Sequence, residues 1–248
     1  MIPKIIHYCW FGRKPLPELA IKCKRTWEEY FPNYKIKEWN EDNFDVFCTQ
    51  YTKEAYEAKK YAFVSDYARF WILYRYGGLY FDTDVEVIRN MDDIVDKGPF
   101  MGCERDISDE TTTLAVAPGL GLGVNPGLGL YKEILGMYET LSFYNPDGTY
   151  NQKTVVAYTT EILCKHGLKA MRGTQECAGV WIYPKDYFCP LDYVSKQLVI
   201  TDNTRTIHHY SASWITISQR LYIRLKKCIG ESHAAKIAQF LKRIKLFK

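Results

Sequence analysis

An apolar stretch over residues 62–76 constrains the fold of this chain more than any other feature. Apolar side chains cover most faces of a helix over this range, and Gly77-Gly78 ends the helix. A helix that is apolar on nearly all sides has to be buried between other elements. Residues 79–81 follow directly and have the pattern of a buried strand. The sequence therefore predicts a layered α/β fold.

The start of the chain predicts a β-α-β unit. Residues 5–10 and 34–39 have the pattern of strands, and residues 18–30 form an amphipathic helix between them. Strands joined through a helix run parallel. Further helices are expected at 53–60, 130–141 and 154–166, and further strands at 99–103, 113–116, 180–183, 198–200 and 206–210. We expect one α/β domain over residues 1–217, with a Rossmann-like, mostly parallel sheet flanked by helices, and C-terminal helices over residues 218–248.

Composition narrows the class of protein. Hydrophobic residues make up 47% of the chain and charged residues 25%, which argues against a disordered or membrane-embedded protein. The first residues enter a strand without the pattern of a signal peptide, and the eight cysteines are scattered without a Cys-x-x-Cys pair. We expect reduced thiols, a cytoplasmic location and no nucleic-acid partner.

Two carboxylates follow the strand expected at residues 79–81. In extended backbone, residues two apart face the same side, so Asp82 and Asp84 can converge on one cation while Thr83 points away. Hard oxygen ligands favour Mg²⁺ or Mn²⁺, which keep waters and share substrate phosphates. An isolated Asp-x-Asp is more often a surface turn. Here it follows a buried helix that carries polar residues of its own, which favours a metal site.

The polar residues of that helix are Asp66 and Arg69, which lie three residues apart and therefore on one face. A lone buried ion pair is usually a structural feature of the core. A guanidinium and a carboxylate also provide fixed donors and acceptors for hydroxyl and phosphate oxygens. Beside the Asp pair, the two residues favour a binding site.

A second polar cluster begins at His208-His209 and ends at Ser213-Trp214. Adjacent residues of a strand face opposite sides, so one histidine is expected to reach a metal, and the sequence leaves open which one. Trp214 can donate its indole N–H to a phosphate oxygen. Trp10, at the end of the first strand, can stack on a base, although most Trp residues in such positions only pack.

Glycine recurs through residues 117–129. The run lacks the Gly-Lys-Ser/Thr ending and the strand-turn-helix context of a P-loop, and it fits a GxGxxG phosphate cradle poorly. We expect a flexible loop that lines a pocket.

These motifs, in this order, resemble the bacterial and fungal glycosyltransferases of family 32, which carry a sugar-binding region with a DxD motif. The resemblance covers most of the chain and rests on residues 2–12, 65–69, 77–84, 182–184, 207–209 and 213–214. Each motif alone is unspecific, whereas the set is highly specific. The clostridial glucosylating toxins have a similar spacing of the residues that match Asp66, Arg69, Tyr80, Asp82 and Asp84.

The resemblance implies a GT-A fold, a UDP- or GDP-sugar donor, Mn²⁺ or Mg²⁺, and transfer that retains the anomeric configuration. It implies an acceptor that is a saccharide or a lipid-linked saccharide, in the synthesis of a capsule or another cell-surface polysaccharide. Carried over to this sequence, it implies that Trp10 stacks on the nucleobase, while Asp66 and Arg69 hold the donor sugar.

The resemblance also assigns the metal and diphosphate site. Asp82 would contact ribose and the metal-bound diphosphate beside Tyr80, with Asp84 the more direct metal ligand. Either His208 or His209 would complete the metal site. The residues expected to meet the departing diphosphate are Ser213 and Trp214.

Two other functions compete with a glycosyltransferase. A phosphohydrolase that uses Asp-x-Asp as nucleophile and acid would have Thr or Val two residues after the second Asp, where this chain has Glu86. A non-catalytic nucleotide-sugar-binding protein is disfavoured because the expected metal ligands are all present. No carboxylate outside the donor-binding set stands out as a covalent nucleophile, so we do not expect a double displacement.

The end of the chain is basic. Apolar residues fall at helical spacing among Lys and Arg residues within 218–248, where the only acidic residue is Glu231. Two interpretations stay open: a closing helix packed on the domain, or a peripheral contact with the anionic inner face of the plasma membrane.

Overall fold

The β-α-β unit predicted at the start of the chain is present in the computed structural model, which describes residues 1–108, 113–193 and 195–211. Its elements are β1 (Ile5–Cys9), α1 (Glu18–Tyr30) and β2 (Lys35–Trp39), and the two strands pair in parallel. The buried residues of α1 include Cys23 and Trp27, which are spaced by about one turn. Trp27 Nε1 donates a hydrogen bond of 2.8 Å to the Val85 carbonyl, which holds α1 against the strand that follows the Asp pair.

The apolar helix is α3 (Tyr61–Tyr76), and it follows the shorter α2 (Gln50–Glu57). Thr49 caps α2 through its hydroxyl, which accepts a hydrogen bond from the Thr52 N–H. Gly77 ends α3 at a φ of 62°, and a Cβ there would lie 2.9 Å from the Val124 carbonyl oxygen. Only glycine fits this turn, which leads directly into the central strand of the sheet.

Within the described residues, eight strands form one sheet in the order β2-β1-β3-β7-β5-β9-β8, with β6 paired to β5. Five strands run in one direction, and β6, β7 and β8 run against them. This confirms the expected α/β class with a mixed, mostly parallel sheet. The strands not yet given are β3 (Gly78–Tyr80), β5 (Phe100–Arg105), β6 (Ala115–Ala117), β7 (Leu122–Val124), β8 (Gln175–Cys177) and β9 (Val180–Tyr183).

A separate antiparallel pair joins the segment after the Asp pair to the segment that ends at the two histidines. It consists of β4 (Val85–Val87) and β10 (Thr206–His208), with His208 opposite Val85. The remaining helices are α4 (Asp92–Val95), α5 (Gly129–Glu139), α6 (Val155–Lys165) and α7 (Lys185–Phe188).

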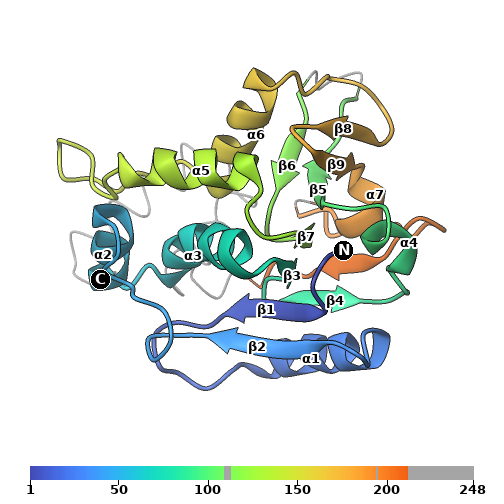
Figure 1. Cartoon of the computed structure of the whole chain (residues 1–248), viewed down its shortest axis with the longest axis horizontal. Helices are drawn as coiled ribbons and strands as arrows, with labels where there is room; N and C mark the ends of the chain where they lie inside the picture. The colour runs from blue at the N-terminus through green and yellow to red at the C-terminus, as the bar shows by residue number, and fades with distance from the viewer. Residues whose placement is uncertain (109–112, 194, 212–248) are drawn as a thin grey trace. The chain divides into compact units, whose positions relative to one another are not determined.

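Two apolar cores lie on opposite faces of the sheet. Alternate residues of β1 divide between them, with Cys9 in one core and Ile6 and Tyr8 in the other. The first core contains the buried faces of α2, α3, α5 and α6, and the second contains those of α1 and α4. Figure 1 shows α3 and α5 lying side by side, and α1 on the side of β1 and β2 away from them. The helices therefore cover the sheet from both sides.

Two predictions about local structure are wrong. The glycine run over residues 117–129 is not one flexible loop: residues 115–124 are buried and form β6, a tight turn and β7. Glycine is needed there for close packing, since a Cβ on Gly123 would lie 2.1 Å from the Phe100 ring. Residues 198–200 form no strand either, and within the described chain only an isolated bridge joins Leu198 to Leu191.

The compact unit described here is Met1–Tyr210. The predicted domain boundary at residue 217 and the predicted helices over 218–248 lie outside the described residues. The seven described cysteines are free thiols. None of the described helices combines the length and the apolar character that a membrane span requires.

Candidate functional site

The candidate site lies where strands of the same direction end. Trp10 directly follows β1, and Asp82 comes two residues after β3, which is parallel to β1. The carboxyl ends of such strands meet at one edge of the sheet, which is where open α/β sheets bind ligands. Helix α3 supplies Asp66 and Arg69, and the β4–β10 pair brings His208 to the same place. Three regions distant in sequence therefore converge: the end of β1, residues 61–87 and β10.

Arg69 connects the helix to the Asp pair. Its Nη2 atom lies 2.8 Å from Asp66 Oδ1 and 3.2 Å from Asp82 Oδ1. The Tyr80 hydroxyl donates a hydrogen bond of 3.2 Å to the same Asp82 oxygen, and the guanidinium carbon of Arg69 lies 5.1 Å from the centre of the Tyr80 ring. One oxygen of Asp82 is thus held by two donors, which fixes the orientation of its carboxylate.

Burial changes the pKa values of the two carboxylates in this group. It raises the pKa of Asp66 to about 7, although the nearby Arg69 opposes the rise. Burial also raises the pKa of Asp82, again against the charge of Arg69. In this buried group the guanidinium provides N–H donors and the two carboxylates provide acceptor oxygens, a combination that suits the hydroxyls of a sugar.

The side chains of the two histidines have different partners. His208 Nε2 lies 3.2 Å from Asp84 Oδ1, and both side chains are largely buried, with 16% and 12% exposed. His209 points to the other side and places its Nε2 atom 2.7 Å from Glu86 Oε2. Of the two imidazoles, that of His208 lies beside the Asp84 carboxylate, whereas His209 contacts Asp84 only through a backbone hydrogen bond of 3.0 Å.

A divalent cation fits this arrangement in part. Asp84 and His208 offer a carboxylate and an imidazole side by side, and hydrogen bonding to Asp84 raises the pKa of His208 to about 10 despite burial. That pairing leaves His208 protonated, and a cation would replace its proton. Within the described residues, no group of three or more His, Cys, Asp and Glu side chains is arranged to hold a metal ion. Mg²⁺ and Mn²⁺ commonly take one or two protein ligands and complete their shell with waters and phosphates.

Trp10 lies at the expected edge and is half-buried. Its Nε1 atom donates a hydrogen bond of 2.6 Å to the Lys14 carbonyl, and its backbone N–H donates to the Trp39 carbonyl at 2.8 Å. The indole is therefore fixed by the segment that follows it, and a base could meet it through its ring face. The two remaining predicted residues, Ser213 and Trp214, lie outside the described residues.

Two residues at the site were not identified from the sequence. Gly119 contributes through its backbone, because its carbonyl oxygen accepts a hydrogen bond of 3.1 Å from the Asp82 N–H. A Cβ on Gly119 would lie 2.0 Å from Asp82 Oδ2, so glycine is required for Asp82 to occupy its position. Glu104, near the end of β5, is half-buried and has its pKa raised by burial, with the charge of His208 opposing the rise. An acidic residue at the carboxyl end of a buried strand was the available signal for Glu104.

Comparison with known proteins supports the resemblance. Residues 17–101 match the family described as the glycosyltransferase sugar-binding region containing DXD motif. This range includes Asp66, Arg69, Tyr80, Asp82 and Asp84. The chain therefore contains this glycosyltransferase region, and its homologues are glycosyltransferases.

Curated relatives match over the same part. Inositol phosphoceramide mannosyltransferase 3 of Schizosaccharomyces pombe is 30% identical over 102 residues, which cover 38% of this chain and 27% of that protein. An uncharacterized glycosyltransferase of Acanthamoeba polyphaga mimivirus is 31% identical over 109 residues, which cover 40% of this chain and 42% of the viral protein. The match thus spans less than half the length of either relative.

Two solved glycosyltransferases align with this chain at low sequence identity and with TM-scores below 0.5. PaToxG glycosyltransferase aligns with a TM-score of 0.48 and 18% identity, covering 66% of this chain and 69% of its own. A glycosyltransferase involved in glycosylation of the major capsid of PBCV-1 aligns with a TM-score of 0.48 and 13% identity, covering 86% and 95%.

Proposed function

Because residues 17–101 carry the DXD-containing sugar-binding region of glycosyltransferases, we propose that the protein is a metal-dependent, retaining glycosyltransferase. The donor in this proposal is a UDP- or GDP-sugar, and the acceptor is a saccharide or a lipid-linked saccharide of a cell-surface polysaccharide such as a capsule. The names of the fungal relatives, which are mannosyltransferases of inositol phosphoceramide, agree with a hexose donor and a lipid-borne acceptor.

One observation carries the proposal. The Asp66–Arg69–Asp82 group and the Asp84–His208 pair lie next to each other at the carboxyl edge of the sheet. The first group offers paired donors and acceptors for sugar hydroxyls. The second offers a carboxylate and an imidazole for a cation. A nucleotide sugar needs both kinds of contact within one molecule's length.

In the proposed reaction, Asp66 and Arg69 hold hydroxyls of the donor sugar while Asp84 and His208 hold the divalent cation. When bound, the cation would neutralise negative charge on the diphosphate. Tyr80 and Arg69 keep Asp82 oriented for the ribose. Because these contacts are fixed before the donor arrives, little reorganisation is needed as charge develops.

In the transfer, the anomeric carbon of the sugar exchanges its bond to the phosphate oxygen for a bond to the acceptor oxygen. The acceptor hydroxyl oxygen bonds to the anomeric carbon on the face from which the diphosphate leaves. The old carbon–oxygen bond breaks, its electron pair stays on the phosphate oxygen, and the hydroxyl proton passes to that oxygen. Attack on the same face retains the anomeric configuration without a covalent enzyme intermediate.

The test replaces one proposed cation ligand. We expect Asp84→Asn to lower Mn²⁺- or Mg²⁺-dependent release of nucleoside diphosphate from UDP- and GDP-sugars by about 100-fold or more. Glu86→Gln is the matched control, because Glu86 also pairs with a histidine but on the other side of the strand. Undiminished release by Asp84→Asn, or release that persists in EDTA, would refute the metal assignment.

We also propose a cytoplasmic location with peripheral contact at the inner face of the plasma membrane through residues 218–248. Support comes from the basic and apolar residues of that segment, which lies outside the described residues. Flotation with anionic liposomes tests this proposal, comparing the full chain with a chain that ends at Gly230. Equal binding of both chains would rule out residues 231–248 as the anchor.

A further inference from the structure

A cavity of about 500 Å³ lies at the ends of two further strands of the sheet. Asp106 directly follows β5 and contributes to its wall, as does Lys185, which begins α7 just after β9. Such a volume lies within the range of small-molecule sites. The remaining lining residues that matter here are Asp186, Asp192, Gln197 and Val199.

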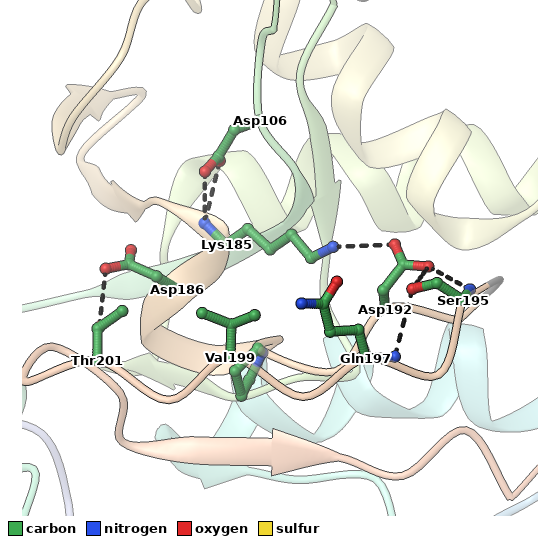
Figure 2. A pocket seen from close by; sticks show the side chains of 9 residues that line it. Asp106, Lys185, Asp186, Asp192, Ser195, Gln197, Val199 and Thr201 are labelled. Atoms are coloured by element: carbon green, nitrogen blue, oxygen red, sulfur yellow. Dashed lines mark hydrogen bonds and ion pairs between the residues drawn. The ribbon is translucent and has the colours of Figure 1, made fainter.

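The wall is built mainly from polar side chains held by local bonds. Both carboxylate oxygens of Asp106 accept the Lys185 backbone N–H, at 3.0 and 3.1 Å. Lys185 Nζ lies 3.4 Å from Asp192 Oδ2 on the other side. Figure 2 shows the Lys185 side chain extended across the cavity, with Asp106 on one side of it and Gln197 and Val199 on the other. The Gln197 amide makes no side-chain hydrogen bond to any residue that the structure describes, and it is exposed.

The cavity and the donor site share one edge of the sheet. β3 and β5 both run antiparallel to β7, which lies between them, so their carboxyl ends point the same way. Two strand spacings amount to about 10 Å, which is the distance expected between the segments that follow β3 and β5. An acceptor seated over β5 and β9 would therefore be within reach of a sugar held over β3.

Aromatic rings also connect the two places. The ring centre of Tyr210 lies 4.3 Å from that of His208 and 5.1 Å from that of Tyr193. The Tyr210 hydroxyl lies 2.9 Å from Cys189 Sγ, just before the chain turns into the wall of the cavity. Tyr193 follows Asp192 of the cavity wall. The rings of Tyr193 and Tyr210 therefore connect this wall to His208, the proposed cation ligand.

An exposed apolar strip of the sequence, three residues long, includes one residue of the cavity wall. Leu198, Val199 and Ile200 are consecutive and are 47%, 53% and 52% exposed, and Val199 also lines the cavity. Three adjacent aliphatic side chains this exposed are unusual where a polar cavity begins. An amphiphile with a polar head in the cavity would place its apolar part along this strip.

We propose that this cavity binds the polyol head of an amphiphilic acceptor, with the apolar part of the acceptor lying against Val199 at the rim and the exposed aliphatic segment that contains it. The proposal rests on the glycosyltransferase function proposed above. Three carboxylates face one Lys in the cavity, so a head without negative charge near Asp106 and Asp186 is favoured over an anionic one. Carboxylate and amide oxygens, with the Gln197 N–H₂, match the hydroxyls of a neutral sugar or cyclitol.

The first test fills the cavity. Gln197→Trp places a large ring at the rim, and Gln152→Trp makes the same change at an exposed position outside the cavity. The probes are methyl and octyl glycosides of glucose, galactose and mannose, with nucleoside diphosphate release and glycoside transfer measured together. We expect Gln197→Trp to lower the ratio of transfer to donor hydrolysis by about tenfold or more, and Gln152→Trp to leave the ratio as in the wild type. An unchanged ratio, or a parallel fall of both rates, would overturn the cavity assignment.

A binding measurement separates this proposal from the proposed function. Saturation-transfer NMR detects the same glycosides without turnover. If the wild type cleaves no nucleotide sugar, the proposed glycosyltransferase function is refuted. If the wild type nevertheless binds glycosides and Gln197→Trp does not, the assignment of the cavity as a glycoside site is still supported. Equal glycoside binding by the wild type and Gln197→Trp, or no binding by either, would refute the cavity as an acceptor site.

The second test addresses the apolar strip. Octyl glycosides, used below their micelle concentration, should bind the wild type about tenfold or more tightly than methyl glycosides, because the chain buries apolar surface. Val199→Asp should remove this advantage, and Ile21→Asp, a matched change at an exposed site on α1, should preserve it. Equal affinities of octyl and methyl glycosides for the wild type would overturn the lipid part of the proposal. A wild-type dimer that Val199→Asp dissociates would assign the strip to a second copy of the chain and overturn it too.

Discussion

Arg69 Nη2 lies 3.2 Å from Asp82 Oδ1, so a residue of the buried helix α3 holds the first carboxylate of the Asp-x-Asp motif. The same nitrogen lies 2.8 Å from Asp66 Oδ1. The guanidinium is therefore shared, and its removal would leave two buried carboxylates near each other without the cation that contacts both. This relationship makes Arg69 both a part of the proposed donor site and a structural residue.

Arg69→Ala should destabilise the protein in a way that depends on pH. Without Arg69 nothing opposes the effect of burial on the pKa of Asp66, so folding at pH 8 has to protonate Asp66 or bury its charge without a guanidinium. We expect the free energy of unfolding at this pH to fall by about 3 kcal/mol or more. Below pH 6 the loss should be smaller, because burial already raises the pKa of Asp66 to about 7 and a protonated carboxyl needs no counter-charge. Urea denaturation at the two pH values measures both losses. In Asp66→Asn/Arg69→Ala one of the two carboxylates is absent, so the pH difference should shrink; an unchanged difference would contradict this account.

The two histidines predict different metal dependence. His208 lies 3.2 Å from Asp84, whereas His209 is held at 2.7 Å from Glu86. We expect His208→Ala to raise the concentration of Mn²⁺ needed for half-maximal donor cleavage by about tenfold or more, and His209→Ala to change it by less than about twofold. A titration of each variant with Mn²⁺ at saturating nucleotide sugar measures this. The reverse order of effects would assign the cation to His209.

The histidine pair also shows what could and could not be predicted from the sequence. Alternation along a strand predicted that only one ring could reach the motif, and the structure agrees. Which ring does so depends on the register of β10 against β4, where His208 lies opposite Val85. That register is set by packing across a large gap in sequence, and no local pattern records it.

Elements with a strong local signal were predicted closely. Helix α1 has the predicted bounds, and α3 begins one residue earlier than expected. Apolar periodicity and the Gly77-Gly78 stop were sufficient for both. The glycine run after residue 117 was misread because glycine is common both in loops and where rings or backbones approach closely. Only the positions of Phe100 and Asp82 distinguish the two cases, and both lie elsewhere in the sequence.

Gly119 should be intolerant of any side chain. A Cβ at this position would lie 2.0 Å from Asp82 Oδ2 and 3.1 Å from Arg69 Nη1, so Gly119→Ala has to displace the Asp82 carboxylate. We expect weaker binding of UDP- and GDP-sugars, seen as a smaller rise in melting temperature on adding donor and Mn²⁺. Gly129→Ala is the matched control, because no atom lies within 4 Å of a Cβ there and alanine favours the helix α5. An equal response of both variants to donor would show that the contact at Gly119 does not matter for binding.

His7 should make stability depend on pH outside the proposed site. Its Nδ1 accepts a hydrogen bond of 3.0 Å from Trp39 Nε1, and its Nε2 lies 3.0 Å from the Gly77 carbonyl. Trp39 can only donate, so this arrangement requires a neutral ring, and burial lowers the pKa of His7 from 6.5 to about 4.

Between pH 6.5 and about pH 4, His7 is protonated in the unfolded chain but neutral in the folded chain. The His7 contribution is complete above pH 6.5, and it is lost as the pH falls from there to about 4, by about 3 kcal/mol in total. We compare the free energy of unfolding at pH 7.5 and pH 5 for the wild type and His7→Gln, whose amide can accept from Trp39 and donate to Gly77 without titrating. The wild type should lose more stability than the variant over this interval. Equal losses would mean that His7 is not buried as a neutral ring between β1 and the turn that ends α3.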